Sequence, residues 1–243
     1  DTSSYGKDLR DGTELSGLLR ALISVPGDYW IRMFYCYPNS FTDEVLEVMA
    51  SDPRFCRYLD MPFQHISDPV LKKMNRKITR KEIEATMARV RRKLPDVAWR
   101  TTFIVGFPTE TDQDFEELVD FVSEGHFQHL GIFLYSDEDN IRSSKFGDPI
   151  PLSLKEERKN RLMEIQQKIS REHHQKMVGS LQQVLVGGFS SETDLLLEGR
   201  NQYQGPEVDG VVYINEGNAT SAGFHQVEIT EAHEYDLVGK ILN

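Results

Sequence analysis

Four strand-like runs of the sequence end in residues that can bind a ligand. They end near Tyr37, near Gln64, at Gly106 and near Tyr135. Phenol and amide groups form hydrogen bonds, and a glycine lets a ligand approach the backbone closely. Because ligands bind at the carboxyl ends of parallel strands, we expect these four positions to border one site.

The sequence lacks the common motifs that would assign chemistry to these positions. It has no G-x-S-x-G, H-E-x-x-H, G-x-x-x-x-G-K-[ST] or G-x-G-x-x-G segment. Gly106-Phe-Pro after a strand resembles a phosphate-binding loop only weakly, because it contains a single glycine. An unrelated barrel enzyme that binds phosphate at Gly106 stays an alternative. We expect Pro108–Thr111 only to start the next helix, and we assign no catalytic residue.

The two cysteines, Cys36 and Cys56, lie in separate strand-like runs and form no C-x-x-C pair. So few cysteines fit a reducing compartment, and we expect two buried, inert thiols in a cytoplasmic protein. No apolar run approaches the roughly 18 residues that a membrane-spanning helix needs. We therefore expect no membrane association and, from these residues, no metal site.

Strand and helix patterns alternate through the first 152 residues, which predicts βαβ units around a parallel sheet. The connections suit either a barrel or an open sheet. We expect Thr42, Ser67 and Thr111 to cap three of the helices. The predicted strands are Trp30–Pro38, Cys56–Gln64, Val97–Phe107 and His129–Ser136.

The sequence pattern changes twice in the remainder of the chain. Residues 153–178 form one highly charged helical pattern, which we expect to link two domains. Residues 179–243 contain five short alternating runs separated by Gly, Pro and Asn, which predict a small antiparallel β-barrel. The predicted domains are therefore 1–152, 153–178 and 179–243.

Negative charge is concentrated in the predicted barrel. The whole chain has a formal net charge of −11. Residues 179–243 contain ten acidic and two basic residues, which gives this segment −8. Such a surface repels nucleic acid and favours a basic protein as partner.

Nine segments, in order, resemble radical S-adenosylmethionine (SAM) methylthiotransferases. DTSSYG, IRMFYCYP, YLDMPFQH, SDPVLKKMNR, RTTFIVGFPTET and GIFLYSDED resemble successive parts of that family's catalytic barrel. ISREHHQKMVG, EGRNQYQGPEVDGVVYI and EITEAHEYDLVG resemble its C-terminal TRAM barrel. The resemblance implies an incomplete TIM-like (β/α) radical SAM barrel followed by a TRAM β-barrel, with SAM as cofactor.

The resemblance also implies roles for several residues. Gln64 is expected to contact the ribose of SAM, and Arg76 to pair with the methionine carboxylate, which its planar guanidinium suits. Thr102 is expected to contact the ribose or the amino acid.

The resemblance implies two further contacts with the cofactor, one to its adenine and one to its methionine amine. Val105 and Gly106 are expected to offer backbone and a bare surface to the adenine. Asp1 and Thr2 fall where related enzymes bind the methionine amine.

One family feature does not occur in the sequence. The C-x-x-x-C-x-x-C loop that holds a [4Fe-4S] cluster is absent, and Cys36 and Cys56 cannot replace three closely spaced thiolates. We therefore expect a fragment that lacks the cluster-binding loop and the N-terminal domain with its second cluster, and that is inactive alone.

Within the family, DTSSYG and EYDLVG look most like the branch that methylthiolates an aspartate of ribosomal small-subunit protein twelve. A basic ribosomal protein would complement the acidic barrel, and we expect no direct nucleic-acid binding. Two alternatives stay open: a tRNA adenosine methylthiotransferase, and a non-catalytic substrate-binding module.

Overall fold

The structure is a computed structural model that describes residues 2–38, 41–138, 143–217 and 222–242. The chain divides into two compact units, Asp1–Gln166 and Gln167–Asn243, and the division falls within helix α6 (Leu152–Gln175). The boundaries predicted from the sequence, 1–152, 153–178 and 179–243, stay predictions. Among the described residues, no helix combines the length and the apolar composition that a membrane crossing needs.

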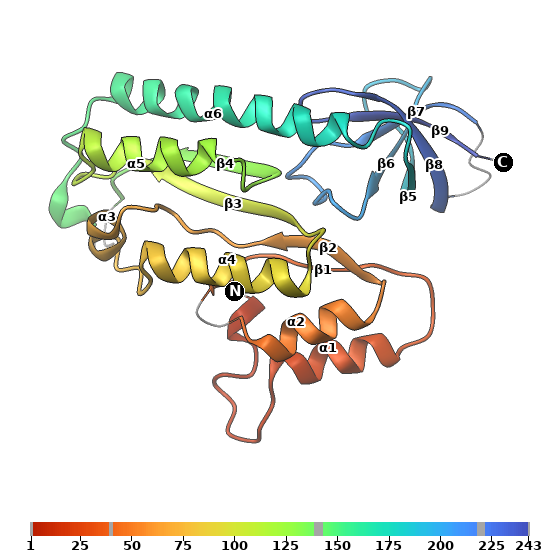
Figure 1. Cartoon of the computed structure of the whole chain (residues 1–243), viewed down its shortest axis with the longest axis horizontal. Coiled ribbons are helices and arrows are strands. Elements are labelled where there is room, and N and C mark those ends of the chain that lie inside the picture. Colours follow the sequence, from red (N-terminus) through yellow and green to blue (C-terminus); the bar gives the residue numbers. More distant parts are fainter. Residues whose placement is uncertain (1, 39–40, 139–142, 218–221, 243) are drawn as a thin grey trace. The chain divides into compact units, whose positions relative to one another are not determined.

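The first unit is built on a four-stranded parallel sheet (Figure 1). Its strands follow the chain in the order β1-β2-β3-β4, as in a segment of a (β/α) barrel. The predicted parallel α/β architecture is confirmed. The strands are β1 (Ile31–Met33), β2 (Phe55–Asp60), β3 (Ala98–Val105) and β4 (His129–Leu134).

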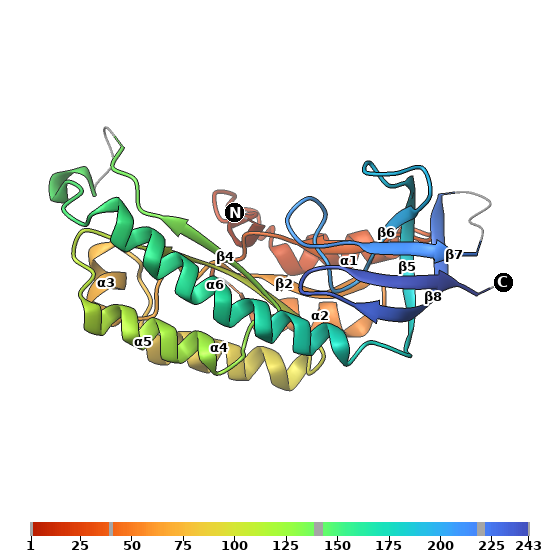
Figure 2. The same cartoon turned by 90° about the horizontal axis from the view of Figure 1, so that it is seen from above.

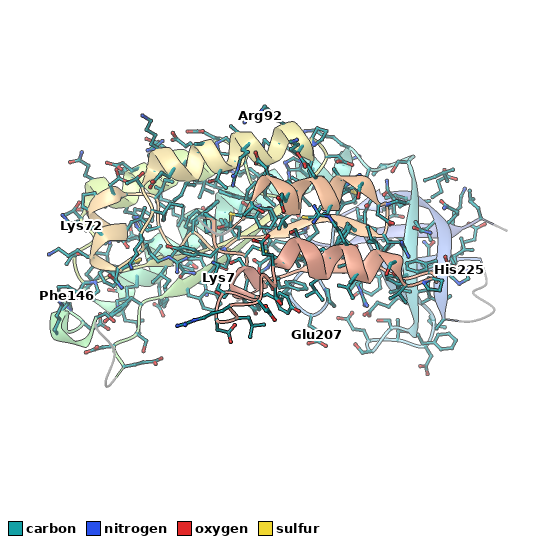
Figure 3. The ribbon with its side chains drawn as sticks, turned by 90° about the horizontal axis from the view of Figure 1, so that it is seen from below. Lys7, Lys72, Arg92, Phe146, Glu207 and His225 are labelled. Atoms are coloured by element: carbon teal, nitrogen blue, oxygen red, sulfur yellow. The ribbon has the colours of Figure 1, made fainter. Side chains whose placement is uncertain are left out.

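Helices precede, connect and follow these strands. They are η1 (Thr2–Ser4), α1 (Leu15–Ser24), α2 (Asp43–Ser51), α3 (Asp68–Lys73), α4 (Arg80–Lys93), α5 (Asp112–Ser123) and η3 (Ser144–Phe146). Helices α1 and α2 pack side by side (Figure 3). Each longer helix buries an apolar stripe, such as Ile83, Met87 and Val90 of α4.

All three residues predicted to cap helices lie at N-cap positions, and two of them make the side-chain capping bond. Thr42 and Thr111 accept hydrogen bonds from the third backbone N–H of α2 and α5, and Thr111 forms a full capping box with Asp114. Ser67 occupies the N-cap position of α3 as predicted, but its side chain makes no capping bond to that helix. Its hydroxyl donates instead to the Asp114 carboxylate, a charged and therefore stronger acceptor.

Two strands are shorter than the sequence pattern predicts. The first ends at Met33, and the chain then turns at Tyr35, whose φ is 54°. The second ends at Asp60, since Pro62 has no N–H with which to continue the ladder. Beyond it, Gln64 returns to the sheet as an isolated bridge to Phe103.

An aromatic cluster forms the centre of the first unit's core. Its rings pack at centroid distances of 5.7 to 6.1 Å, mostly in tilted or edge-on geometries. All five side chains are at most 1% exposed. The cluster ties β3 to α5 and so fixes the strand ends that border the site. Its members are Phe63, Trp99, Phe103, Phe121 and Phe127.

The second unit contains a closed five-stranded barrel, as predicted. The strand order is β5-β6-β7-β9-β8, and valine and isoleucine side chains fill the interior. One pair differs from the predicted antiparallel pattern, because β7 and β9 are parallel. Strand β9 pairs with β8 in antiparallel orientation along one edge and with β7 along its other edge. The strands are β5 (Leu181–Phe189), β6 (Leu197–Asn201), β7 (Val212–Glu216), β8 (Gly223–Ala232) and β9 (Leu237–Ile241).

Candidate functional site

A pocket of about 500 Å³ lies in the first unit at the carboxyl ends of β2, β3 and β4. In Figures 1 and 2, α3 and the segment after β4 lie beyond this same end of the sheet, and Figure 3 places Lys72 and Phe146 there. Apolar side chains form one wall and polar ones another, as in many small-molecule sites. The wall residues include Ile104, Phe107 and Tyr135, with Gln64, Lys73 and Arg76.

A smaller pocket of about 180 Å³ adjoins the end of β1 and includes Tyr35, Cys36 and Tyr37. Gln64 and Arg76 line both pockets. The structure therefore brings together two of the residues predicted to contact the cofactor, from different loops.

Arg76 is held by contacts that leave part of its guanidinium available. One Nη2–H donates to the Pro62 carbonyl at 2.8 Å, and the guanidinium carbon lies 4.9 Å from the centroid of the Tyr37 ring. Its buried Nε has no hydrogen-bond partner among the described residues. Burial lowers the pKa of Arg76 from its ordinary value, although an arginine stays charged. A partly buried cation that lines both pockets fits a carboxylate ligand.

Residues with a left-handed backbone conformation are concentrated at these pockets. Among the described residues, four residues other than glycine have a φ in this range, and three of them line a pocket. These three are Tyr35 at 54°, Gln64 at 74° and Asn75 at 59°. Such conformations cost about 1 kcal/mol or more and concentrate at functional sites. The backbone therefore supports the location that the pockets indicate.

The sheet joins Gln64 to Thr102. The Gln64 N–H donates to the Thr102 carbonyl, and the Gln64 carbonyl accepts from the Ile104 N–H, both at 2.8 Å. Thr102 is 9% exposed. Its predicted contact with the ribose or amino acid stays a prediction, as do those of Gln64 and Arg76.

Thr2 also lies close to the smaller pocket. Its hydroxyl donates to the Phe34 carbonyl at 2.5 Å, and the Ser3 hydroxyl accepts from the Tyr37 N–H at 2.8 Å. These bonds hold η1 against the segment that contains Tyr35 and Cys36. Asp1, the other residue predicted to bind the methionine amine, lies outside the described residues.

Val105 and Gly106 are covered by protein. The Val105 side chain is fully buried, and its carbonyl accepts from the Tyr135 N–H at 2.9 Å. Gly106 has a φ of 75°, and a Cβ added there would lie 2.3 Å from Cγ of Lys155. The glycine is therefore required by its backbone and by the Lys155 stem. Adenine binding at Val105 and Gly106 stays a prediction.

Two buried carboxylates hold the backbone that follows β3 and the backbone that follows β1. Glu110 accepts from the Gly106 N–H at 2.8 Å and from Arg158 at 2.6 Å. Asp60 accepts from the Tyr35 N–H at 2.9 Å and from Arg100 at 3.0 Å. In each case an arginine–carboxylate pair binds the N–H of a left-handed residue, so the strained turn is fixed rather than free.

The prediction that Pro108–Thr111 only starts a helix is therefore wrong for Glu110. Its carboxylate is fully buried, and Oε2 lies 3.6 Å from the ring of buried His65. Sequence reasoning also missed Lys155 and Arg158, which come from the start of α6. Contacts between residues of separate elements reveal these roles, 20 positions apart for Lys155 and Tyr135 and 48 for Arg158 and Glu110, so no local pattern could have identified them.

The residues of this chain do not fit an iron–sulfur cluster. Cys36 and Cys56 are 0% and 1% exposed. Within the described part of the chain, no three His, Cys, Asp or Glu side chains are grouped as metal ligands. Burial, followed by the charge of Asp60, raises the pKa of Cys36 to about 12, so its thiol is protonated. No reaction step through a cluster is therefore assigned to these residues.

Comparison with known proteins finds a family match within each unit. Residues 5–122 match the radical SAM superfamily, and residues 178–242 match the TRAM domain. The two matches have the order that the sequence resemblance predicted, a radical SAM region followed by a TRAM domain.

Similar full-length relatives carry one name. The chain is 42% identical to the "Ribosomal protein uS12 methylthiotransferase RimO" of Geobacter sulfurreducens, over 100% of this chain and 54% of the relative. The proteins of that name from Desulfotalea psychrophila and Bdellovibrio bacteriovorus are 45% and 47% identical, also over the whole chain. The chain is RimO-like throughout and spans about half the length of these relatives.

Proposed function

We propose that this chain is part of a radical SAM methylthiotransferase that modifies an aspartate of ribosomal protein uS12. The observation that carries the proposal is the similarity to RimO proteins over all 243 residues, through both the radical SAM region and the TRAM barrel. The chain alone is expected to be inactive, because its own residues do not fit the [4Fe-4S] clusters expected in the full-length protein.

The larger pocket is the proposed site for SAM. Its apolar wall suits an adenosyl group, and the guanidinium of Arg76, which lines both pockets, suits the methionine carboxylate. Gln64 and Thr102 are proposed to orient the ribose, Val105 and Gly106 to lie near the adenine, and Asp1 and Thr2 near the amine. When bound, SAM supplies the hydrogen-abstracting chemistry of its enzyme family.

Titration calorimetry with S-adenosylhomocysteine tests this site. The probe carries the adenosyl, amine and carboxylate groups that the proposed residues bind, and saturable binding to the wild-type chain is expected. Inorganic phosphate is the matched probe for the phosphate-binding alternative. Phosphate binding at Gly106 with no binding of S-adenosylhomocysteine would contradict the proposal.

The acidic barrel is proposed to attract the basic substrate protein. Its charge of −8 complements a basic ribosomal protein and repels the phosphates of tRNA. Action on a ribosomal protein also supports a cytoplasmic location.

Fluorescence anisotropy with labelled uS12 and labelled tRNA separates the two substrates. We expect binding of uS12 that weakens as salt rises, and no binding of tRNA at physiological salt. Salt-dependent binding of tRNA without binding of uS12 would favour a tRNA methylthiotransferase. Failure of both ligands to bind would overturn the partner assignment.

A further inference from the structure

Lys155 is a buried cation that the proposed cofactor contacts do not use. It lies in the first turn of α6 and is 2% exposed. Its ammonium donates to the Tyr135 carbonyl at 2.8 Å and to the Asp148 carboxylate. Asp148 is partly exposed and can be hydrated, whereas the Tyr135 carbonyl is the buried acceptor.

The aliphatic stem of Lys155 makes a separate contact. It occupies the space where a Cβ of Gly106 would lie, at 2.3 Å from Cγ and 2.8 Å from Cδ. One side chain thus covers the end of β3 with its stem and binds the end of β4 with its ammonium. These are the two strands whose ends form the apolar wall of the pocket.

Tyr135 connects these contacts to the pocket. It is 7% exposed and packs edge-on against Phe107 at a centroid distance of 5.2 Å. The Lys155 ammonium lies 5.4 Å from the centre of the Tyr135 ring, within cation–π range. Both aromatic rings line the larger pocket, so a shift of Tyr135 would change its shape.

We propose that Lys155 is a positioning residue for this pocket: through the Tyr135 carbonyl and ring it holds the β4 wall against Phe107 in the form that binds ligand. The identity of the ligand, an adenosyl compound, rests on the proposed function, whereas the positioning of Tyr135 does not. The predicted 1–152 domain would exclude this residue, so the binding unit has to extend into α6.

Three substitutions test the proposal. Lys155→Met keeps an unbranched stem over Gly106 but removes the ammonium. Lys168→Met makes the same change at an exposed position of the same helix. Asp148→Ala removes the partly exposed partner and leaves the bond to Tyr135 intact.

Two readouts are measured well below the melting temperature, where all variants are folded. We expect Lys155→Met to weaken binding of S-adenosylhomocysteine about tenfold, the usual effect of losing a charged hydrogen bond. We expect faster hydrogen exchange at the amides of residues 134–136 but not in the aromatic core. The two control variants should stay within about twofold of wild type in both measurements.

The outcomes distinguish the two proposals. If the wild-type chain does not bind S-adenosylhomocysteine, the cofactor assignment fails, and exchange at residues 134–136 alone decides the role of Lys155. A lower melting temperature with unchanged affinity and unchanged local exchange would overturn the positioning role. An Asp148→Ala variant as impaired as Lys155→Met would also overturn it, because the ion pair would then be the important contact.

A wild-type measurement covers the case in which Lys155→Met does not fold. We expect a slowly exchanging ¹⁵N ammonium resonance for Lys155, coupled across the hydrogen bond to the Tyr135 carbonyl carbon. A rapidly exchanging, uncoupled ammonium would contradict the proposal.

Discussion

At the scale of single residues, Arg76 is the most informative position of the proposed cofactor site. Its guanidinium stacks on Tyr37 and donates to the Pro62 carbonyl, which fixes its plane without neutralising its charge. Because both contacts are with neutral groups, Arg76 stays a cation at the wall of the pockets.

Replacing Arg76 by Met should weaken binding of S-adenosylhomocysteine by about 30-fold or more, because a partly buried charge pair with the carboxylate is lost. Calorimetry should show a much smaller effect on 5′-deoxyadenosine, which lacks the carboxylate. Arg92→Met, at an exposed position of α4, is the matched control (Figure 3). Equal losses for both ligands would contradict a carboxylate contact.

Cys36 provides a test of burial through pH. Burial raises the pKa of its thiol to about 12, whereas an unfolded cysteine titrates near 8.5. The unfolded state therefore loses its proton first, and stability contributed by the neutral thiol falls as pH rises from about 8.5 towards 12.

Urea unfolding of the wild-type chain should accordingly show a steeper loss of stability between pH 9 and 11 than unfolding of Cys36→Ala. Native protein at pH 8 should leave both thiols unreactive towards Ellman's reagent, since Cys36 and Cys56 are buried. Rapid reaction of either thiol before unfolding would show that the strand ends open easily.

At the scale of elements, α6 and the end of β3 are joined by the Glu110–Arg158 pair. Glu110 also binds the Gly106 N–H, so the helix, the strand end and the turn depend on one carboxylate. A buried pair is costly to break, because removing one charge leaves the other desolvated.

Glu110→Gln should lower the free energy of unfolding of the first unit by about 3 kcal/mol. Urea titration followed by circular dichroism measures the change. Glu116→Gln removes a carboxylate of α5 from its exposed pair with Arg161 and should have a much smaller effect. Similar losses in the two variants would contradict the special role of the buried pair.

At the scale of the whole molecule, charge is distributed unevenly along the chain. The barrel segment contributes −8 of the total of −11, although it is about a quarter of the length. Association driven by such a field depends on salt and on which acids are present.

Neutralising three exposed barrel acids by Glu192→Gln, Asp194→Asn and Glu216→Gln should weaken uS12 binding severalfold at low salt. The difference should shrink in high salt, as anisotropy titrations can show. The control neutralises three exposed acids of the first unit, Asp8, Glu14 and Asp28, and makes the same change in total charge. An equal effect of both triple variants would show that net charge, and not the barrel, attracts the substrate.

Much of the architecture was accessible from the sequence. Apolar periodicity predicted the parallel sheet, the helices that connect it and a five-stranded barrel, because these patterns arise from neighbours along the chain. Ordered motifs also indicated the family and placed Gln64 and Arg76 at one site. The errors occurred where a distant residue competed with a local interaction, as Asp114 does for the Ser67 hydroxyl.

The sequence by itself thus determined the class of fold and the resemblance to one family, and it predicted the edge of the sheet at which a ligand would bind. Only the tertiary structure decided that Gly106 faces Lys155, that Glu110 is buried, and that Tyr135 is held by a helix beginning at Leu152. The physical reason is that burial and charge pairing depend on residues far apart in the chain, such as Glu110 and Arg158, which are 48 positions apart. Periodicity along the chain records which side chains turn inward, but not which of them meet there.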